Sequence, residues 1–142
     1  MDTLIEQLIR VYYEDEQWHK DKMTYEEIKK YYETLFTKER IITYVEKDEL
    51  LGYLESWRLN AHQLIKVLSH QRFPIAEENI NQGPLCYLAS LWVKKDRRQG
   101  YVIKKLRRLF YKYNRDADYF CGEEFNHGNR FRMRRNLKSK EK

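Results

Sequence analysis

Apolar residues recur every three or four positions in residues 3–13, 25–37 and 60–70. This period predicts three amphipathic helices, each with one face in the core. Residues 101–113 have the same period, with apolar side chains on one side and five Lys or Arg residues on the other. The pattern therefore predicts a fourth helix whose outer face is strongly basic.

The segments between these helices do not keep the helical period of apolar residues, and they are rich in β-branched and aromatic residues. Residues 40–47 and 50–57 flank a short polar turn at 48–49, so they predict a β-hairpin. Residues 85–93 and 117–122 are apolar and predict buried strands. Because a helix connects the last two strands, they should be parallel neighbours. The sequence thus predicts a mixed α/β (α+β) fold, with a mostly antiparallel sheet, one parallel strand pair and helices on both faces.

The composition favours one folded domain over a disordered or membrane-spanning chain. Hydrophobic residues make up 42% and aromatic residues 15% of the 142 residues, enough for a substantial core. No apolar run approaches the roughly 20 residues of a membrane helix, and the first residues lack the layout of a signal peptide. We therefore expect a cytoplasmic protein with no membrane partner. Cys86, Cys121 and four scattered histidines have no metal-ligand spacing, so no metal site is expected.

Positive charge is concentrated in the last third of the chain. Residues 1–93 hold 11 Lys/Arg and 16 Asp/Glu, whereas residues 94–142 hold 17 and 6. This asymmetry predicts an anionic partner: a phosphorylated cofactor, a nucleic acid or both. We assign residues 1–128 to a single domain and residues 129–142 to a basic C-terminal tail that can start with a short strand. The candidate nucleic-acid contacts in the tail are Arg130, Arg132, Arg134 and Arg135.

The basic stretch "RRQGYVIKKL", residues 97–106, has a single glycine directly before the basic helix. The first amides of a helix have no acceptor within the helix, so they are available to an anion, and the helix dipole adds attraction. Gly100 has no Cβ that would keep a phosphate away from these amides. The residues alone leave two interpretations open: a phosphate-binding turn, or a surface turn with solvated charges.

The longer stretch "LWVKKDRRQGYVIKKL" resembles motif A of the GCN5-related N-acetyltransferases (GNATs), in which a strand leads through Arg/Gln-x-x-Gly-x-Gly/Ala into a helix. Arg97 to Val102 fill that pattern, and Leu106 follows one turn later. The order of the predicted elements over residues 24–122 also matches the family. The resemblance implies a GNAT-like sheet whose parallel strands are splayed at a cofactor cleft. Small members of such reduced build occur in bacteriophages and mobile elements, so the build fits a phage origin.

The resemblance implies an N-acyltransferase that uses acetyl-CoA and acts on an amine. The cofactor would lie between strands 85–93 and 117–122, with its pantetheine arm along the first strand and its pyrophosphate at the glycine turn. The residues implied for the pantetheine arm are Leu91, Trp92 and Val93. The residues implied for the phosphate end are Arg97, Arg98, Gln99, Gly100, Tyr101 and Val102.

The sequence departs from the family in features that bear on catalysis. Val102 stands where the family prefers Gly or Ala, which could crowd the phosphates. Strand 85–93 lacks the glutamate that often serves as base, and the arginine-rich tail replaces a helix that often carries a tyrosine proton donor. Glu55 is the candidate base, on a strand face turned either to the cleft or to solvent. Further candidates are Glu123 and Glu124 as bases, and Tyr87, Tyr113 and Tyr119 as proton donors to the thiolate.

No motif specifies the acceptor. The basic C-terminal part predicts a nucleic acid, or a protein associated with one, as the source of the amine. Two alternatives to the enzyme stay open: a module that binds nucleic acid electrostatically, and a catalytically inactive GNAT-fold protein that acts by binding nucleic acid or another partner. The strand without a carboxylate, residues 85–93, is the feature that favours an inactive protein.

Overall fold

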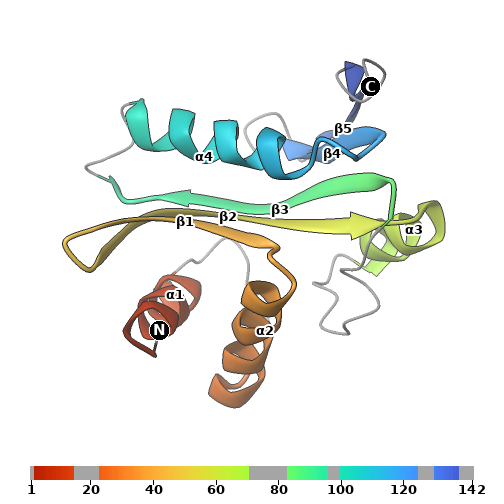
Figure 1. The fold of residues 1–142 in the computed structure, drawn as a ribbon. Coiled ribbons are helices and arrows are strands. Elements are labelled where there is room, and N and C mark those ends of the chain that lie inside the picture. Colours follow the sequence, from red (N-terminus) through yellow and green to blue (C-terminus); the bar gives the residue numbers. More distant parts are fainter. Residues whose placement is uncertain (1, 15–22, 71–82, 96–99, 125–129, 138–142) are drawn as a thin grey trace.

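A computed structural model describes residues 2–14, 23–70, 83–95, 100–124 and 130–137. Its elements in chain order are α1 (Asp2–Glu14), α2 (Tyr25–Thr37), β1 (Ile41–Glu46), β2 (Glu49–Leu59), α3 (Ala61–His70), β3 (Leu85–Val93), α4 (Tyr101–Tyr113), β4 (Tyr119–Glu124) and β5 (Arg130–Arg135). Figure 1 shows them in layers, with α1 and α2 on one face of the sheet and α4 on the other. The helices and strands predicted from the hydrophobic period are thus confirmed, with small shifts at their ends.

The five strands form one sheet in the order β1-β2-β3-β4-β5. All neighbouring strands are antiparallel except β3 and β4, which are parallel and joined by α4 as a crossover. This confirms the predicted mixed sheet. The hairpin turn lies at Lys47 and Asp48, one residue earlier than predicted, and both residues have φ in the left-handed region (50° and 63°). Such a two-residue turn matches the twist of the paired strands.

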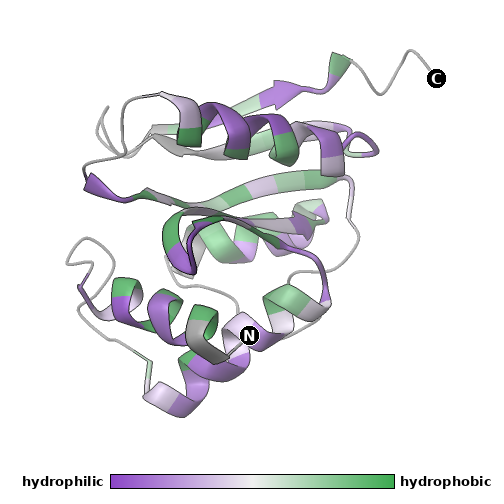
Figure 2. Cartoon of the chain, turned by 60° about the vertical axis from the view of Figure 1, so that its left-hand side comes forward, coloured by the Kyte–Doolittle hydropathy of each residue, from purple (hydrophilic) through white to green (hydrophobic). Residues whose placement is uncertain are grey.

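Two hydrophobic cores lie on opposite faces of the sheet. The first core packs α1, α2 and α3 against strand side chains such as Trp57 and Tyr87. The second core packs Val102, Leu106 and Phe110 of α4 against the other face. Figure 2 shows the alternation of hydrophilic and hydrophobic residues along α4 that this one-sided burial requires. None of the helices in the described ranges is long and apolar enough to cross a membrane.

The segment predicted as a basic tail contributes a strand to the sheet. β5 pairs with β4 over its whole length, from Tyr119 opposite Arg135 to Glu124 opposite Arg130. Phe131 packs against the first core. The short strand predicted for this segment is therefore present, and residues 130–135 form the fifth strand of the sheet. The predicted turn before this strand lies outside the described residues.

Helix α4 lies very close to β2 at one point. A Cβ built on Gly52 would lie 2.9 Å from Cγ1 of Val102 and 3.1 Å from Cδ1 of Leu106. Real Cβ atoms do not approach a methyl group to 2.9 Å, so only glycine fits at this position without displacing the helix. Gly52 therefore makes room for the branched side chain of Val102, which stands where the GNAT motif prefers a small residue.

We predict that Gly52→Ala destabilises the protein by about 1–3 kcal/mol, the usual cost of overpacking a core. Combining it with Val102→Ala should cost less than the sum of the two single changes, because the added methyl group then enters the space that the valine leaves. Urea unfolding of the four proteins measures this coupling. Additive free energies would contradict the close packing of these two residues.

Candidate functional site

The two parallel strands part before they end. Leu85 to Leu88 of β3 pair with Tyr119 to Gly122 of β4. β3 then continues to Val93, while the last residues of β4 pair only with β5 among the described strands. The carboxyl ends of the two strands are therefore not paired with each other, and we call this parting of the strands the opening. In α/β sheets, ligands bind at this end of parallel strands.

A β-bulge accounts for the opening. Glu55 of β2 pairs with Ser90 of β3, and Ser56 pairs with Leu88, so Ala89 is an extra residue in β3. A bulge bends the strand that carries it and increases its twist. The bend therefore falls directly after Leu88, the last residue of β3 that pairs with β4.

The opposite end of the parallel pair is held by a buried arginine. Arg58 of β2 is only 4% exposed, and its Nη1 lies 2.8 Å from Oδ1 of Asp116, just before β4. Its Nε donates to the carbonyl of Gly83, just before β3, at 2.8 Å. The hydrogen bond from Arg58 lowers the pKa of Asp116. One guanidinium thus joins the starts of both parallel strands, so β3 and β4 part at one end only.

The N-terminus of α4 lies beyond the open end of β3. Gly100 is its N-cap, with φ 99° and ψ −67°, and no side chain of the described residues caps the helix. By contrast, Thr24 and Glu27 form a capping box at α2, and Asn60 and Gln63 exchange hydrogen bonds at the start of α3. Among the described residues, no atom would lie within 4 Å of a Cβ on Gly100. The side of the turn where that Cβ would point is thus open with respect to the described part of the chain, next to first-turn amides that need a partner.

Val102, the residue that the sequence suggested could crowd the phosphates, lies in the first turn of α4. Its side chain is fully buried in the second core, against Gly52 and Leu106. It therefore points into the sheet and away from the open side of the turn.

The other residues implied for cofactor binding lie partly on the opening. Leu91, Trp92 and Val93 follow the last β3–β4 pair, and Leu91 is exposed while Trp92 stacks on Tyr53. Tyr101 begins α4 and is also exposed. The predicted residues Arg97, Arg98 and Gln99 lie outside the described residues.

Glu55 is buried in the first core, not on a solvated edge. The residue is 3% exposed, and its carboxylate accepts a hydrogen bond from the hydroxyl of Tyr31 on α2 at 2.9 Å. That hydroxyl in turn accepts from Nε1 of Trp57 at 3.1 Å. Because paired residues of antiparallel strands share a face, Glu55 also lies beside Ser90, two residues past the point where β3 leaves β4.

Burial sets the protonation of this carboxyl group. Loss of solvent raises the pKa of Glu55 to about 7, although hydrogen bonds from Tyr31 and Tyr32 oppose the shift. Burial and the nearby Glu55 together raise the pKa values of both tyrosines well above their usual range, so the tyrosines stay protonated as donors. Glu55 can therefore take or give a proton near neutral pH.

The predicted proton donors lie in different places. Tyr87 is buried and stacks on Trp57, with ring centroids 5.4 Å apart, so it belongs to the aromatic cluster around Glu55. Tyr119 lies opposite Leu85 at the closed end of the strand pair, and Tyr113 lies exposed at the end of α4. The side chains of two predicted bases, Glu123 and Glu124, lie outside the described residues.

Sequence reasoning missed the residues that hold Glu55. Tyr31 and Tyr32 appear in the sequence only as part of an apolar helical stripe. The signal that could have identified them is their hydroxyl groups, since a buried tyrosine needs a hydrogen-bond partner. A glutamate on a strand rich in aromatic residues is such a partner.

Comparisons with known proteins identify the fold. No family model matches the chain, and no curated protein matches its sequence. Among solved structures, the loading GNATL domain of CurA from Lyngbya majuscula aligns with a TM-score of 0.56 at 13% identity over 84% of this chain. The GphF GNAT-like decarboxylase in complex with isobutyryl-CoA aligns with a TM-score of 0.53 at 12% identity over 84% of this chain. This chain spans 59% and 60% of the lengths of these two proteins. The protein has the GNAT fold.

We predict that Glu55 makes the stability of the protein depend on pH. The folded state holds the Glu55 proton up to a pKa of about 7, whereas the unfolded chain releases it near 4.5. The stabilisation that the protonated Glu55 gives to the folded state is therefore fully present below pH 4.5 and is lost as pH rises through about 7. The loss amounts to at most roughly 3.5 kcal/mol.

Glu55→Gln keeps an acceptor for Tyr31 but does not titrate. Urea unfolding of both proteins between pH 4 and 8 should show that the wild type loses stability relative to the variant as pH rises. Parallel curves would contradict a buried carboxyl group that titrates near neutrality.

Proposed function

We propose that the protein binds acetyl-CoA and transfers the acetyl group to an amine. The observation that carries the proposal is the opening between β3 and β4, which leads from Ala89 along β3 to the uncapped start of α4 at Gly100. The GNAT fold supports it, and so does the acyl-CoA bound by one protein of similar fold, the GphF GNAT-like decarboxylase.

The two ends of the opening fit the two ends of the cofactor. The extended pantetheine arm suits the stretch of β3 from Ala89 to Val93, which continues beyond its last partner in β4. The pyrophosphate suits the first amides of α4, where Gly100 leaves space for its oxygens. Arg97 and Arg98 add positive charge next to the turn in the sequence.

When bound, acetyl-CoA supplies an activated thioester. In the proposed reaction the backbone at the bulge, around Ala89, donates a hydrogen bond to the carbonyl oxygen as it gains negative charge. The amine nitrogen bonds to the carbonyl carbon, and the bond from that carbon to sulfur breaks. Glu55 takes the amine proton through a water in the opening, because its pKa of about 7 suits this task near neutral pH.

The departing thiolate needs a proton. Of the three candidate donors, Tyr87 has the best position, because it stacks on Trp57 beside the Glu55 cluster. Tyr119 lies at the closed end of the strand pair, opposite Leu85. Replacement of Tyr87 by phenylalanine is thus expected to slow transfer more than the same change at Tyr119.

A second candidate is a catalytically inactive protein that uses the same fold for binding. The observation that favours it is the enclosure of Glu55, which is 3% exposed and held by tyrosines of α2. In that case Glu55 only attaches α2 to the sheet. The two candidates differ in turnover, whereas both allow coenzyme A to bind.

We predict that Gly100→Val weakens coenzyme A binding at least tenfold, because the side chain fills the space proposed for the pyrophosphate. The positive φ of 99° adds a stability cost of about 1–2 kcal/mol. Acetyl-pantetheine, which lacks the pyrophosphate, separates the two effects. Turnover with this short donor should be equal in the wild type and the variant at a temperature where both are folded. Unchanged binding of coenzyme A, measured by calorimetry, would contradict the phosphate site.

We predict that Glu55→Gln lowers kcat for amine acetylation by about 10²- to 10⁴-fold, the usual contribution of a general base. Coenzyme A affinity should not change. Tyr31→Phe removes a hydrogen bond that lowers the pKa of Glu55, so it should move the rising limb of the wild-type rate profile to higher pH. If Glu55→Gln alters only the free energy of unfolding, Glu55 is a structural residue.

A further inference from the structure

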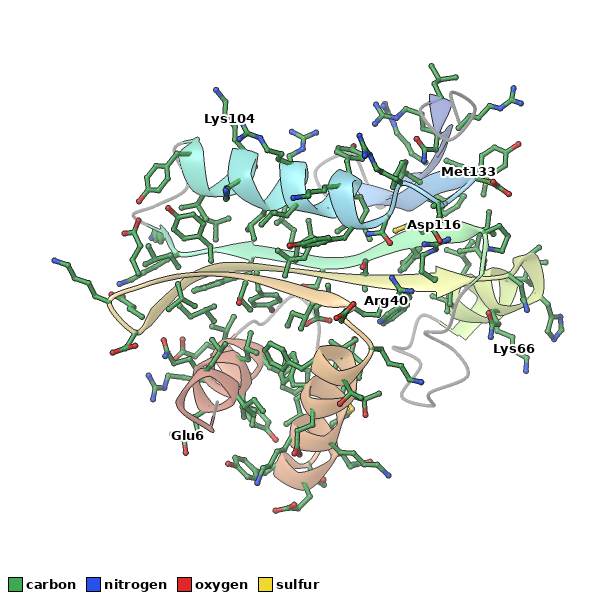
Figure 3. The ribbon with its side chains drawn as sticks, in the orientation of Figure 1. Glu6, Arg40, Lys66, Lys104, Asp116 and Met133 are labelled. Carbon is green, nitrogen blue, oxygen red and sulfur yellow. The ribbon has the colours of Figure 1, made fainter. Side chains whose placement is uncertain are left out.

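The outer face of α4 is uniformly basic. The helix carries Lys104, Lys105, Arg107, Arg108 and Lys112 and contains no Asp or Glu. All five side chains are exposed. Figure 3 shows Lys104 on the side of α4 that is turned away from the sheet. The positive charges are therefore not neutralised by acidic residues of their own helix.

β5 continues this positive charge beside the helix. Side chains of a strand alternate between the two faces of a sheet, and Phe131 packs into the first core, so Arg132 and Arg134 lie on the α4 face. The contacts of Arg134 confirm that its side chain lies on the α4 face. Its Nη2 donates to the hydroxyl of Tyr111 on α4 at 2.9 Å, and its guanidinium lies 5.7 Å from the centroid of the Tyr111 ring. This contact joins β5 to α4. Arg135, by the same alternation, lies on the opposite face.

We infer that the outer face of α4 and the α4 face of β5 form one surface that binds the sugar-phosphate backbone of a nucleic acid. We call it the basic surface, and it consists of Lys104, Arg107, Arg108, Lys112, Arg132 and Arg134. It goes beyond acetyl transfer and does not depend on coenzyme A binding.

The chemistry of the basic surface favours nucleic acid over an anionic membrane. A membrane-binding helix inserts apolar side chains, but Val102, Leu106 and Phe110 of α4 are buried in the second core. Four of the six basic residues are arginines, whose planar guanidinium groups bind phosphates through two hydrogen bonds. Exposed tyrosines lie at both ends of the helix, Tyr101 and Tyr113, where bases can stack.

The C-terminal half of α4 provides a test that leaves the proposed cofactor site intact. Arg108 and Lys112 lie about 12 and 18 Å from Gly100 along the helix axis. Arg108→Gln/Lys112→Gln removes two positive charges from the basic surface. A matched control, Lys66→Gln/Arg135→Gln, also removes one Lys and one Arg charge from exposed positions. Lys66 lies on the other side of the sheet from Lys104 (Figure 3). Arg135 lies on the face of β5 opposite to Arg134, as the alternation along the strand requires.

The experiment measures binding of a labelled 20-nucleotide mixed-sequence DNA strand, and of its duplex, at a series of KCl concentrations. We expect the surface variant to bind at least tenfold more weakly than the wild type in 100 mM KCl. The slope of log K against log salt should fall by about 0.7–0.9 for each phosphate that the variant no longer neutralises, so by about 1.4–1.8 for the two substitutions together. The control variant should keep the wild-type slope. The single strand and the duplex arms show which form the surface prefers.

Three results would overturn the inference. The first is DNA binding by the wild type that does not depend on the KCl concentration. The second is an equal loss of DNA affinity in the surface and control variants, which would reflect net charge alone. The third is that polyglutamate or phosphatidylserine vesicles bind the wild type as tightly as DNA does and lose the same affinity when Arg108 and Lys112 are replaced. Coenzyme A affinity of the surface variant is measured in parallel. Loss of DNA binding with coenzyme A binding retained supports the basic surface whatever the outcome for acetyl transfer.

Discussion

The parallel strands β3 and β4 are hydrogen-bonded to each other at their starts but not at their carboxyl ends. The candidate site depends on this arrangement. Arg58 joins the starts of both strands through Gly83 and Asp116, so that end stays closed. The extra residue Ala89 bends β3 where its pairing with β4 ends. A strand that leaves its neighbour exposes backbone groups that a ligand can pair with, and β3 continues from this point towards the start of α4. The bulge lies at one end of the parallel pair and the ion pair at the other, so the two strands are paired only over their first four residues.

The same bulge lies beside a titratable group, Glu55, near the point where β3 leaves β4. Glu55 pairs with Ser90, directly after the extra residue, and lies in a core of aromatic side chains. Burial disfavours its ionised form, while the hydroxyl of Tyr31 stabilises that form, so the pKa of about 7 results from two opposing effects. Ionisation of a carboxyl group in this position costs stability as pH rises through about 7. Such a cost is typical of groups that are kept for proton transfer.

The period of hydrophobic residues was enough to predict the helices, the strands and the parallel pair, because burial of one face governs each of them. It could not reveal Gly52 as the partner of Val102, since their contact joins residues far apart in the sequence. The network of Glu55 and Tyr31 was hidden for the same reason. The C-terminal arginines were assigned to a tail because their charge outweighs the apolar alternation of Phe131 and Met133. Pairing with β4 supplies the missing stabilisation, and the arginines on this edge strand discourage pairing with further chains.

Helix α4 links the two proposed binding functions, and its one-sided burial keeps them apart. Val102, Leu106 and Phe110 fix the helix on the sheet, so its N-terminus stays at the end of β3 and its outer face stays in solvent. The amides at the N-terminus point along the axis, whereas the lysine and arginine side chains point away from it. A bound cofactor and a bound polyanion would therefore approach α4 from different directions. Both ligands are negatively charged, so the positive charge of the helix favours each of them without requiring that they compete for the same groups. In an acetyltransferase with this arrangement, the basic surface would concentrate nucleic acid, or proteins bound to it, near the cleft where the amine must react.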